Sequence, residues 1–86
     1  MILNIKKNEL DGRKMGFRET ITLSALTNNY CNSCEELARF VYNDEPNDNT
    51  KQCVFSNIDR LRKRGLHIQR QNGKGYRLIE TIYIDY

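Results

Sequence analysis

The chain has 86 residues, of which 38% are hydrophobic, and carries 14 Lys and Arg against 11 Asp and Glu, a net charge of +3. This length predicts one domain, residues 1–86, with a small core. No stretch approaches the roughly 18–20 apolar residues of a membrane span, and Ile2-Leu3 is too short for the core of a signal peptide. We therefore expect a cytoplasmic protein without membrane partners, whose three cysteines are free thiols.

The first third of the chain predicts short strands and one helix. Residues 2–6 (ILNIK) are typical of a strand. Residues 8–16 contain Asp11-Gly12 and predict a turn or loop, at the tip of an N-terminal hairpin. Residues 20–28 predict a first helix with a weak apolar pattern, because threonines lower its helix propensity.

A second helix is predicted to begin after Ser33. Ser33 and Glu36 have the spacing of a capping box, which satisfies free backbone N–H groups at a helix start. The residues expected on the buried face of this helix are Leu37, Phe40 and Val41. Residues 44–49 (DEPNDN) then predict a loop, since Pro46 does not continue a helix. This loop is long for the turn of a helix-turn-helix.

A basic amphipathic helix is predicted over residues 50–64, with Thr50 as its N-cap. Its apolar stripe consists of Val54, Ile58 and Leu61. At about 100° per residue, the opposite face carries Gln52, Ser56, Asp59 and Lys63, flanked by Arg60. Phe55 lies on the flank, where packing against the first helix or the following hairpin is favoured over contact with a base. Gly65 suits the left-handed residue after the helix end.

A β-hairpin is predicted to follow this helix. Residues 66–70 alternate in strand fashion, with His67 on the exposed face, and residues 76–79 resume a strand in which Tyr76 is a core or hinge residue. Asn72-Gly73 is a strong turn signal, because both residues tolerate positive φ. Residues 81–86 (TIYIDY) predict a further strand or an extended tail.

Positive charge is concentrated on this helix and hairpin. Residues 51–77 contain eight basic residues and one acid, Asp59, so their local charge is 8 − 1 = +7. The remainder of the chain is therefore net negative. Such a cluster is typical of a protein that binds phosphate backbones. The alternative is an ordinary solvated helix face.

Other side chains suggest a metal site or an enzyme only weakly. Cys31, Cys34, Cys53 and His67 are the ligand types of a Cys₃His zinc site, but small semi-buried cysteines explain the three thiols more simply. No nucleophile with a partner base and no phosphate-binding Gly loop before a helix is present. We therefore predict neither a metal, nor a cofactor, nor an enzymatic activity.

The segment 20–79 resembles the winged helix-turn-helix at the N-terminus of biotin operon repressors. The matching residues are Ser33, Glu35, Leu37, Ile58, Leu61, Arg62 and Gly65 on the helices, and Gly73, Lys74, Gly75, Tyr76 and Leu78 in the hairpin. The long loop and the strings RLRKR and GYRL also resemble effector domains of response regulators. The resemblance implies an α+β fold: a three-helix winged helix-turn-helix with a C-terminal β-hairpin wing and short terminal strands.

The function that this resemblance implies is sequence-specific binding of double-stranded DNA by a small transcriptional regulator. The helix 50–64 would lie in the major groove, and the wing 70–77 would lie on the backbone or in the minor groove. The residues expected to bind DNA are Lys51, Gln52, Ser56, Asn57, Arg60, Lys63, Arg64, Arg70, Lys74 and Arg77. Asp59 on the same face would repel phosphate unless it contacts a cytosine amino group.

Two further expectations concern partners. A single small module rarely supplies enough affinity and specificity, so we expect a homodimer formed through the N-terminal strand or the strand 81–86. The size of the chain suits a repressor from a phage or mobile element. In the alternative, the chain is a winged-helix protein-interaction module that binds a polymerase or another host factor through the acidic remainder of the chain. Folding of the acidic loop 44–49 over the third helix would make DNA reading difficult and favour this alternative. RNA binding is a weaker third alternative.

Overall fold

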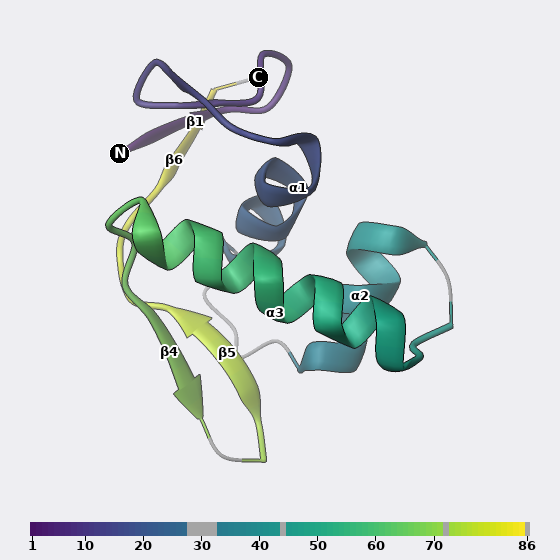
Figure 1. Ribbon diagram of the computed structural model, residues 1–86. Helices are drawn as coiled ribbons and strands as arrows, with labels where there is room; N and C mark the ends of the chain where they lie inside the picture. The colour runs from purple at the N-terminus through teal and green to yellow at the C-terminus, as the bar shows by residue number, and fades with distance from the viewer. Residues whose placement is uncertain (28–32, 44, 72, 86) are drawn as a thin grey trace.

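The computed structural model describes residues 1–27, 33–43, 45–71 and 73–85 (Figure 1). Within these residues the chain forms an α+β fold with three helices and two sheets. The helices are α1 (Phe17–Leu26), α2 (Cys34–Tyr42) and α3 (Asp48–Lys63). The strands are β1 (Ile2–Asn4), β2 (Glu9–Leu10), β3 (Arg13–Lys14), β4 (Ile68–Gln71), β5 (Gly75–Leu78) and β6 (Tyr83–Asp85). No helix of the described residues has the length and apolar character needed to cross a membrane.

The N-cap of α2 at Ser33 is confirmed, whereas α1 begins earlier than predicted. The Ser33 hydroxyl oxygen accepts a hydrogen bond from the backbone N–H of Glu36 at 3.1 Å. Helix α1 begins at Phe17 rather than at residue 20. Its hydroxyls at Thr20 and Thr22 donate to carbonyl oxygens one turn earlier, so these threonines are buried without unsatisfied groups.

The predicted start of α3 at Thr50 is wrong, because Asn47 caps the helix instead. The Asn47 side-chain oxygen accepts from the backbone N–H of Thr50 at 3.0 Å, and the Thr50 hydroxyl oxygen accepts from that of Asn47 at 2.9 Å. This reciprocal pair satisfies two backbone groups, which a cap at Thr50 alone does not. The predicted loop 44–49 is therefore shorter: its last two residues are helical.

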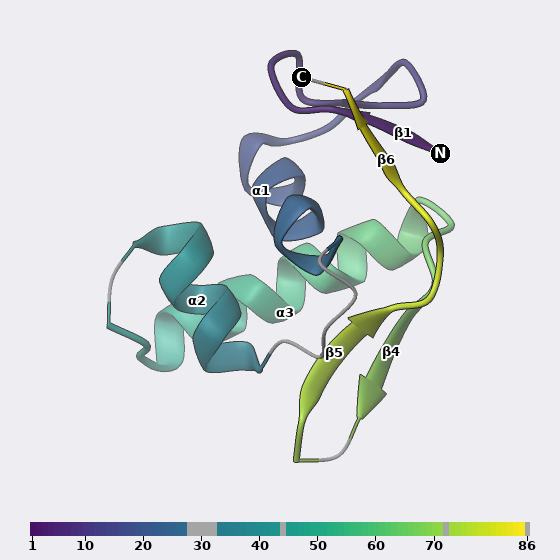
Figure 2. The same ribbon diagram turned by 180° about the vertical axis from the view of Figure 1, so that it is seen from behind.

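Four short strands form a sheet in the order β3-β2-β1-β6. Strand β1 pairs with β2 in antiparallel and with β6 in parallel fashion, so Leu3 lies between Leu10 and Ile84. The further strand predicted in residues 81–86 is thus present, although Tyr86 itself lies outside the described residues. The predicted turn Asp11-Gly12 joins β2 to β3 with φ values of 51° and 80°. Both chain ends consequently lie beside this sheet (Figures 1 and 2).

The second sheet is the β4–β5 hairpin, which projects beyond α3 (Figure 2). Ile68, Tyr76 and Leu78 are buried, which confirms the predicted alternation. Gly73 has a φ of 74° after the predicted Asn72, which lies outside the described residues. A single core joins strands β1 and β2, the three helices and the hairpin.

The expectation that Phe40 is buried is wrong, since 59% of it is exposed. Leu37, Ala38 and Val41 form the buried face of α2. At about 100° per residue, Phe40 falls outside the arc that these three residues define. A spacing of three residues from Leu37 places Phe40 about 60° beyond one edge of this arc, where it is open to solvent.

The cap geometry yields a stability prediction. We expect Asn47→Ala to lower the free energy of unfolding by about 1 kcal/mol, because it removes the cap of α3. Urea denaturation followed by circular dichroism measures the change. Asn49→Ala, inside the first turn and without a capping hydrogen bond, is the matched control, and an equal loss in the two variants would contradict the assigned cap.

Candidate nucleic-acid interface

Helix α3 lies across the face of the molecule shown in Figure 1. Val54, Ile58 and Leu61 are all buried, as predicted. The side chains expected on the opposite face are exposed, namely Gln52, Ser56, Asp59, Arg60 and Lys63. The helix therefore offers a polar surface to solvent over most of its length.

Asn57, expected to contact base edges, is instead a core residue with 2% exposure. Its amide nitrogen donates to the hydroxyl oxygens of Thr22 at 3.3 Å and Tyr42 at 3.2 Å. At about 100° per residue, Asn57 lies in the same arc of α3 as Ile58 and Leu61, so its position is an inward one despite its polar side chain. Asn57 joins α3 to both other helices and does not reach an external partner.

Two of the predicted cations on α3 form exposed ion pairs. Lys51 lies 3.2 Å from Glu35, and Lys63 lies 3.1 Å from Asp59 one turn earlier. The pKa of the Glu35 carboxyl is lowered by its own backbone N–H and then by Lys51. Exposed pairs of this kind contribute roughly 0–1 kcal/mol. Because these pairs are weak, both lysines can release the carboxylate and bind a phosphate instead. Lys63 also offsets the negative charge of Asp59, which would repel a phosphate.

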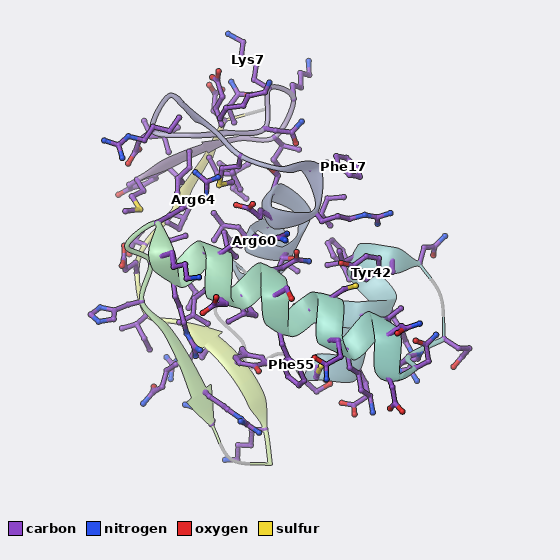
Figure 3. The ribbon with its side chains drawn as sticks, in the orientation of Figure 1. Lys7, Phe17, Tyr42, Phe55, Arg60 and Arg64 are labelled. Atoms are coloured by element: carbon purple, nitrogen blue, oxygen red, sulfur yellow. The ribbon has the colours of Figure 1, made fainter. Side chains whose placement is uncertain are left out.

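Arg64, the third predicted cation of this region, is bound more firmly. Its Nε donates to the carboxylate of Glu19 at 2.8 Å, and Glu19 is buried in the first turn of α1. Removing the arginine would leave this carboxylate buried without its partner, which is costly. Figure 3 shows Arg64 at the end of α3 that faces the N-terminal sheet. This arginine therefore ties α3 to α1.

Arg62 also stabilises the fold. Its Nε and Nη2 donate to the carbonyl oxygen of Ile68 at 3.1 and 2.8 Å, and its guanidinium lies 5.9 Å from the centre of the Tyr76 ring. The side chain thereby fixes the β4–β5 hairpin relative to the last turns of α3.

The hairpin carries its predicted cations on opposite faces. Arg70 pairs across the strands with the buried Tyr76, whereas Arg77 pairs with Gln69 on the outer face. Arg70 and Lys74 line a cleft of about 230 Å³ that also includes Phe55 of α3. The structure therefore brings Arg70 and Lys74 beside α3 but not Arg77.

Phe55 and Tyr76 connect this cleft to the core. The two rings meet edge to face, with centroids 6.4 Å apart and planes at 66°, which confirms that Phe55 packs against the hairpin. Burial raises the pKa of the Tyr76 hydroxyl. His67 is exposed, as predicted. Its backbone N–H donates to the carboxylate of Glu80 at 2.9 Å.

A second hollow of about 230 Å³ lies on the other side of α3, next to α1 and α2. Its lining residues are Arg18, Tyr42, Gln52, Cys53, Ser56, Asn57 and Arg60. Within the described part of the chain, the Arg60 guanidinium has no hydrogen bond or ion pair, so its charge is not neutralised by a carboxylate. In Figure 3, Arg60 rises from α3 toward α1, and Tyr42 lies farther along the same side.

Sequence reasoning missed Arg18 as a member of this surface. Its guanidinium lies 4.6 Å from the centre of the Tyr42 ring and donates to the carbonyl oxygen of Val41. A cation in the first turn of a helix is disfavoured by the helix dipole. That unfavourable position was the available signal that Arg18 has a tertiary partner. Nothing in the pattern of α3 reveals it, because Arg18 comes from another element.

The weak zinc candidates do not form a cluster among the described residues. No group of three or more His, Cys, Asp or Glu side chains comes together there, and Cys31 lies outside those residues. Cys34 is half-buried, and burial raises the pKa of its thiol, which lies 3.9 Å from the carbonyl oxygen of Lys51. Cys53 is exposed.

Comparison of the chain with protein-family models, with curated proteins and with solved structures finds no match. The activity of the site is accordingly inferred from its own geometry and charge.

The inward position of Asn57 leads to a second prediction. Asn57→Ala leaves the Thr22 and Tyr42 hydroxyls without this donor and opens a small void, so we expect a loss of about 1–3 kcal/mol in the free energy of unfolding. Its exposed neighbour Ser56→Ala should change the same quantity by less than about 0.5 kcal/mol. Urea denaturation of both variants measures this, and equal stabilities would contradict a structural role for Asn57.

Proposed function

We propose that this chain is a winged helix-turn-helix protein that binds double-stranded DNA sequence-specifically as a small transcriptional regulator. The observation that carries the proposal is that the polar face of α3 lies between two hollows lined by cations. Arg18 and Arg60 line one of them, and Arg70 and Lys74 line the other. A helix in a major groove has a phosphate strand on each side, and this arrangement of charge suits both strands.

The polar side chains of α3 support insertion into the major groove. That groove is about 12 Å wide and admits an α-helix, whose side chains then reach the base edges. Gln52 and Ser56 are exposed and can donate and accept hydrogen bonds there. Arg60 lies one turn beyond Ser56, where it can reach a guanine edge or a phosphate.

The turn between α2 and α3 is compatible with this geometry. Because α3 begins at Asp48, the connection is confined to the N-terminal end of the helix (Figure 1). Gln52 and Ser56 in the central turns of α3 are exposed, so residues 45–47 do not cover them. The β4–β5 hairpin would act as the wing and contact the backbone or the minor groove through Arg70 and Lys74, while Arg77 faces the other way.

A homodimer remains part of the proposal. Strands β1 and β6, which were expected to pair between chains, pair with each other within one chain. Strand β6 is at one edge of the four-stranded sheet and β3 is at the other. A second copy would therefore add to one of these edges, and sedimentation of the DNA complex distinguishes one protomer from two.

A protein-interaction module is the second candidate function. Phe17 and Phe40 are 60% and 59% exposed, on α1 and α2 respectively. Exposed phenylalanines are typical of surfaces that bind other proteins. A polymerase or another host factor is the kind of partner this alternative predicts, and the two functions need not share a surface.

The first test of DNA binding is its dependence on salt. We expect the chain to bind random-sequence duplex DNA with an affinity that falls steeply between low and physiological salt, by a slope of about 0.9 per phosphate contact on logarithmic axes. The double variant Arg60→Ala/Lys74→Ala should reduce this slope by about 2. Fluorescence anisotropy measures both affinities.

Lys7→Ala is the matched control for this experiment. Lys7 is exposed in the turn between β1 and β2, far from α3 and the hairpin (Figure 3). It should bind as the unmodified protein does. Absence of binding at low salt would reject the DNA-binding function and favour the search for a protein partner.

A further inference from the structure

We propose that the hollow between α1 and α3 binds one backbone phosphate of duplex DNA, held between the guanidinium groups of Arg18 and Arg60. This assignment rests on the proposed function and deepens it. It adds a phosphate contact on the side of α3 that the hairpin does not reach, from a residue of α1 that lies outside the basic segment.

Arg18 is held in place before any ligand binds. Its guanidinium lies between two aromatic rings, 4.6 Å from the centre of Tyr42 and 5.7 Å from that of Phe17. One N–H group donates to the carbonyl oxygen of Val41. A guanidinium has five N–H donors, so others remain for a phosphate oxygen. Because its orientation is already fixed, little side-chain entropy is lost when a phosphate binds.

Arg60 supplies the second positive group from the opposite wall. Among the described residues it has no carboxylate partner, unlike Lys63 and Arg64 on the same helix. It lies one turn after Ser56, so the guanidinium and the hydroxyl occupy the same side of α3. Both side chains line the hollow. Arginine is well suited to phosphate because its planar N–H groups bind two oxygens at once.

The rest of the lining fits an anion. Its residues include the hydroxyl of Tyr42 and no Asp or Glu. The volume of about 230 Å³ corresponds to several waters at roughly 30 Å³ each, which a phosphodiester group would displace. Two cations without a facing carboxylate repel each other, and a bound phosphate relieves that repulsion.

The two hollows would then hold the two strands that border the major groove. Arg70 and Lys74 lie on the hairpin side of α3, and Arg18 and Arg60 lie on the side of α1 and α2. Contacts on both sides fix the rotation of the helix about its own axis. That rotation decides whether Gln52 and Ser56 face the base edges, so phosphate contacts position the residues that read sequence.

The test combines a variant with a chemical probe. Arg18→Met keeps an aliphatic side chain against Tyr42 but removes the charge, and Arg39→Met on the exposed face of α2 is its control. We expect the salt slope for duplex binding to fall by about 1 in Arg18→Met and to stay unchanged in Arg39→Met. Cys53 lines the same hollow, so bound duplex should slow its alkylation by iodoacetamide in the unmodified protein and less so in Arg18→Met.

Each outcome decides between the proposals. If Arg18→Met has the same salt slope and the same protection of Cys53 as the unmodified protein, the phosphate site between Arg18 and Arg60 is overturned. If Arg60→Ala/Lys74→Ala nevertheless weakens binding, the DNA-binding function stands. Absence of duplex binding by the unmodified protein rejects both. If inorganic phosphate protects Cys53 as well as duplex at equal phosphate concentration, the hollow is a site for free phosphate and the assignment to DNA is wrong. If Arg18→Met does not fold, the test uses the unmodified protein alone. Duplex that does not protect Cys53 from alkylation then overturns the phosphate site, and duplex that does protect it supports the site.

Discussion

The arrangement of the three helices depends on the amide of one buried side chain. Asn57 of α3 donates to Thr22 of α1 and to Tyr42 of α2, so a single residue orients both neighbouring helices. Tyr42 in turn supports the guanidinium of Arg18. A contact inside the core is therefore continuous with the surface hollow, because Tyr42 accepts the Asn57 hydrogen bond with its hydroxyl and contacts Arg18, which lines the hollow, with its ring. In a low-dielectric interior such a network is specific, since a shift of any helix leaves a polar group unsatisfied.

The basic residues of α3 serve two different purposes, which a count of charges does not separate. Arg62 holds the hairpin through the carbonyl oxygen of Ile68, and Arg64 holds α1 through the buried Glu19. Both are near the end of α3, where cations also suit the helix dipole. Lys63 is paired with an exposed acid that costs little to exchange. Arg60, in the last turn of α3, instead lines the hollow beside α1 and has no carboxylate partner among the described residues.

The sequence was a good guide where a regular pattern sets the structure. The inward stripe of α3, the cap at Ser33 and the alternation of the hairpin all follow from local spacing, and the structure has each of them. The start of α3 was misplaced because neighbouring residues compete as caps, whereas α1 begins after Gly16 without any side-chain cap. Asn47 and Thr50 are both good capping residues, and only their reciprocal hydrogen bonds place the helix start at Asp48.

Long-range contacts account for what the sequence could not reveal. The type of Asn57 suggests a surface residue, whereas its position on α3 faces two hydroxyl groups from other helices. The parallel pairing of β1 with β6 joins the two ends of the chain, and no local pattern specifies such a partner. Part of the candidate site also depends on long-range packing. Arg18 and Arg60 line one hollow only because α1 packs beside α3.

Some cations of this domain hold its elements together, and others line the two hollows beside α3. This difference bears on how such a small domain could recognise DNA. Cations engaged with Ile68 and Glu19 fix where the hairpin and α1 lie relative to α3. The cations that line the two hollows, Arg18, Arg60, Arg70 and Lys74, lie on both sides of the helix. If the proposed function is correct, phosphate contacts of this kind fix the register of α3 in the groove, and Gln52 and Ser56 then discriminate among bases. Specificity would in that case depend on the rigidity of the core as much as on the residues that touch the bases.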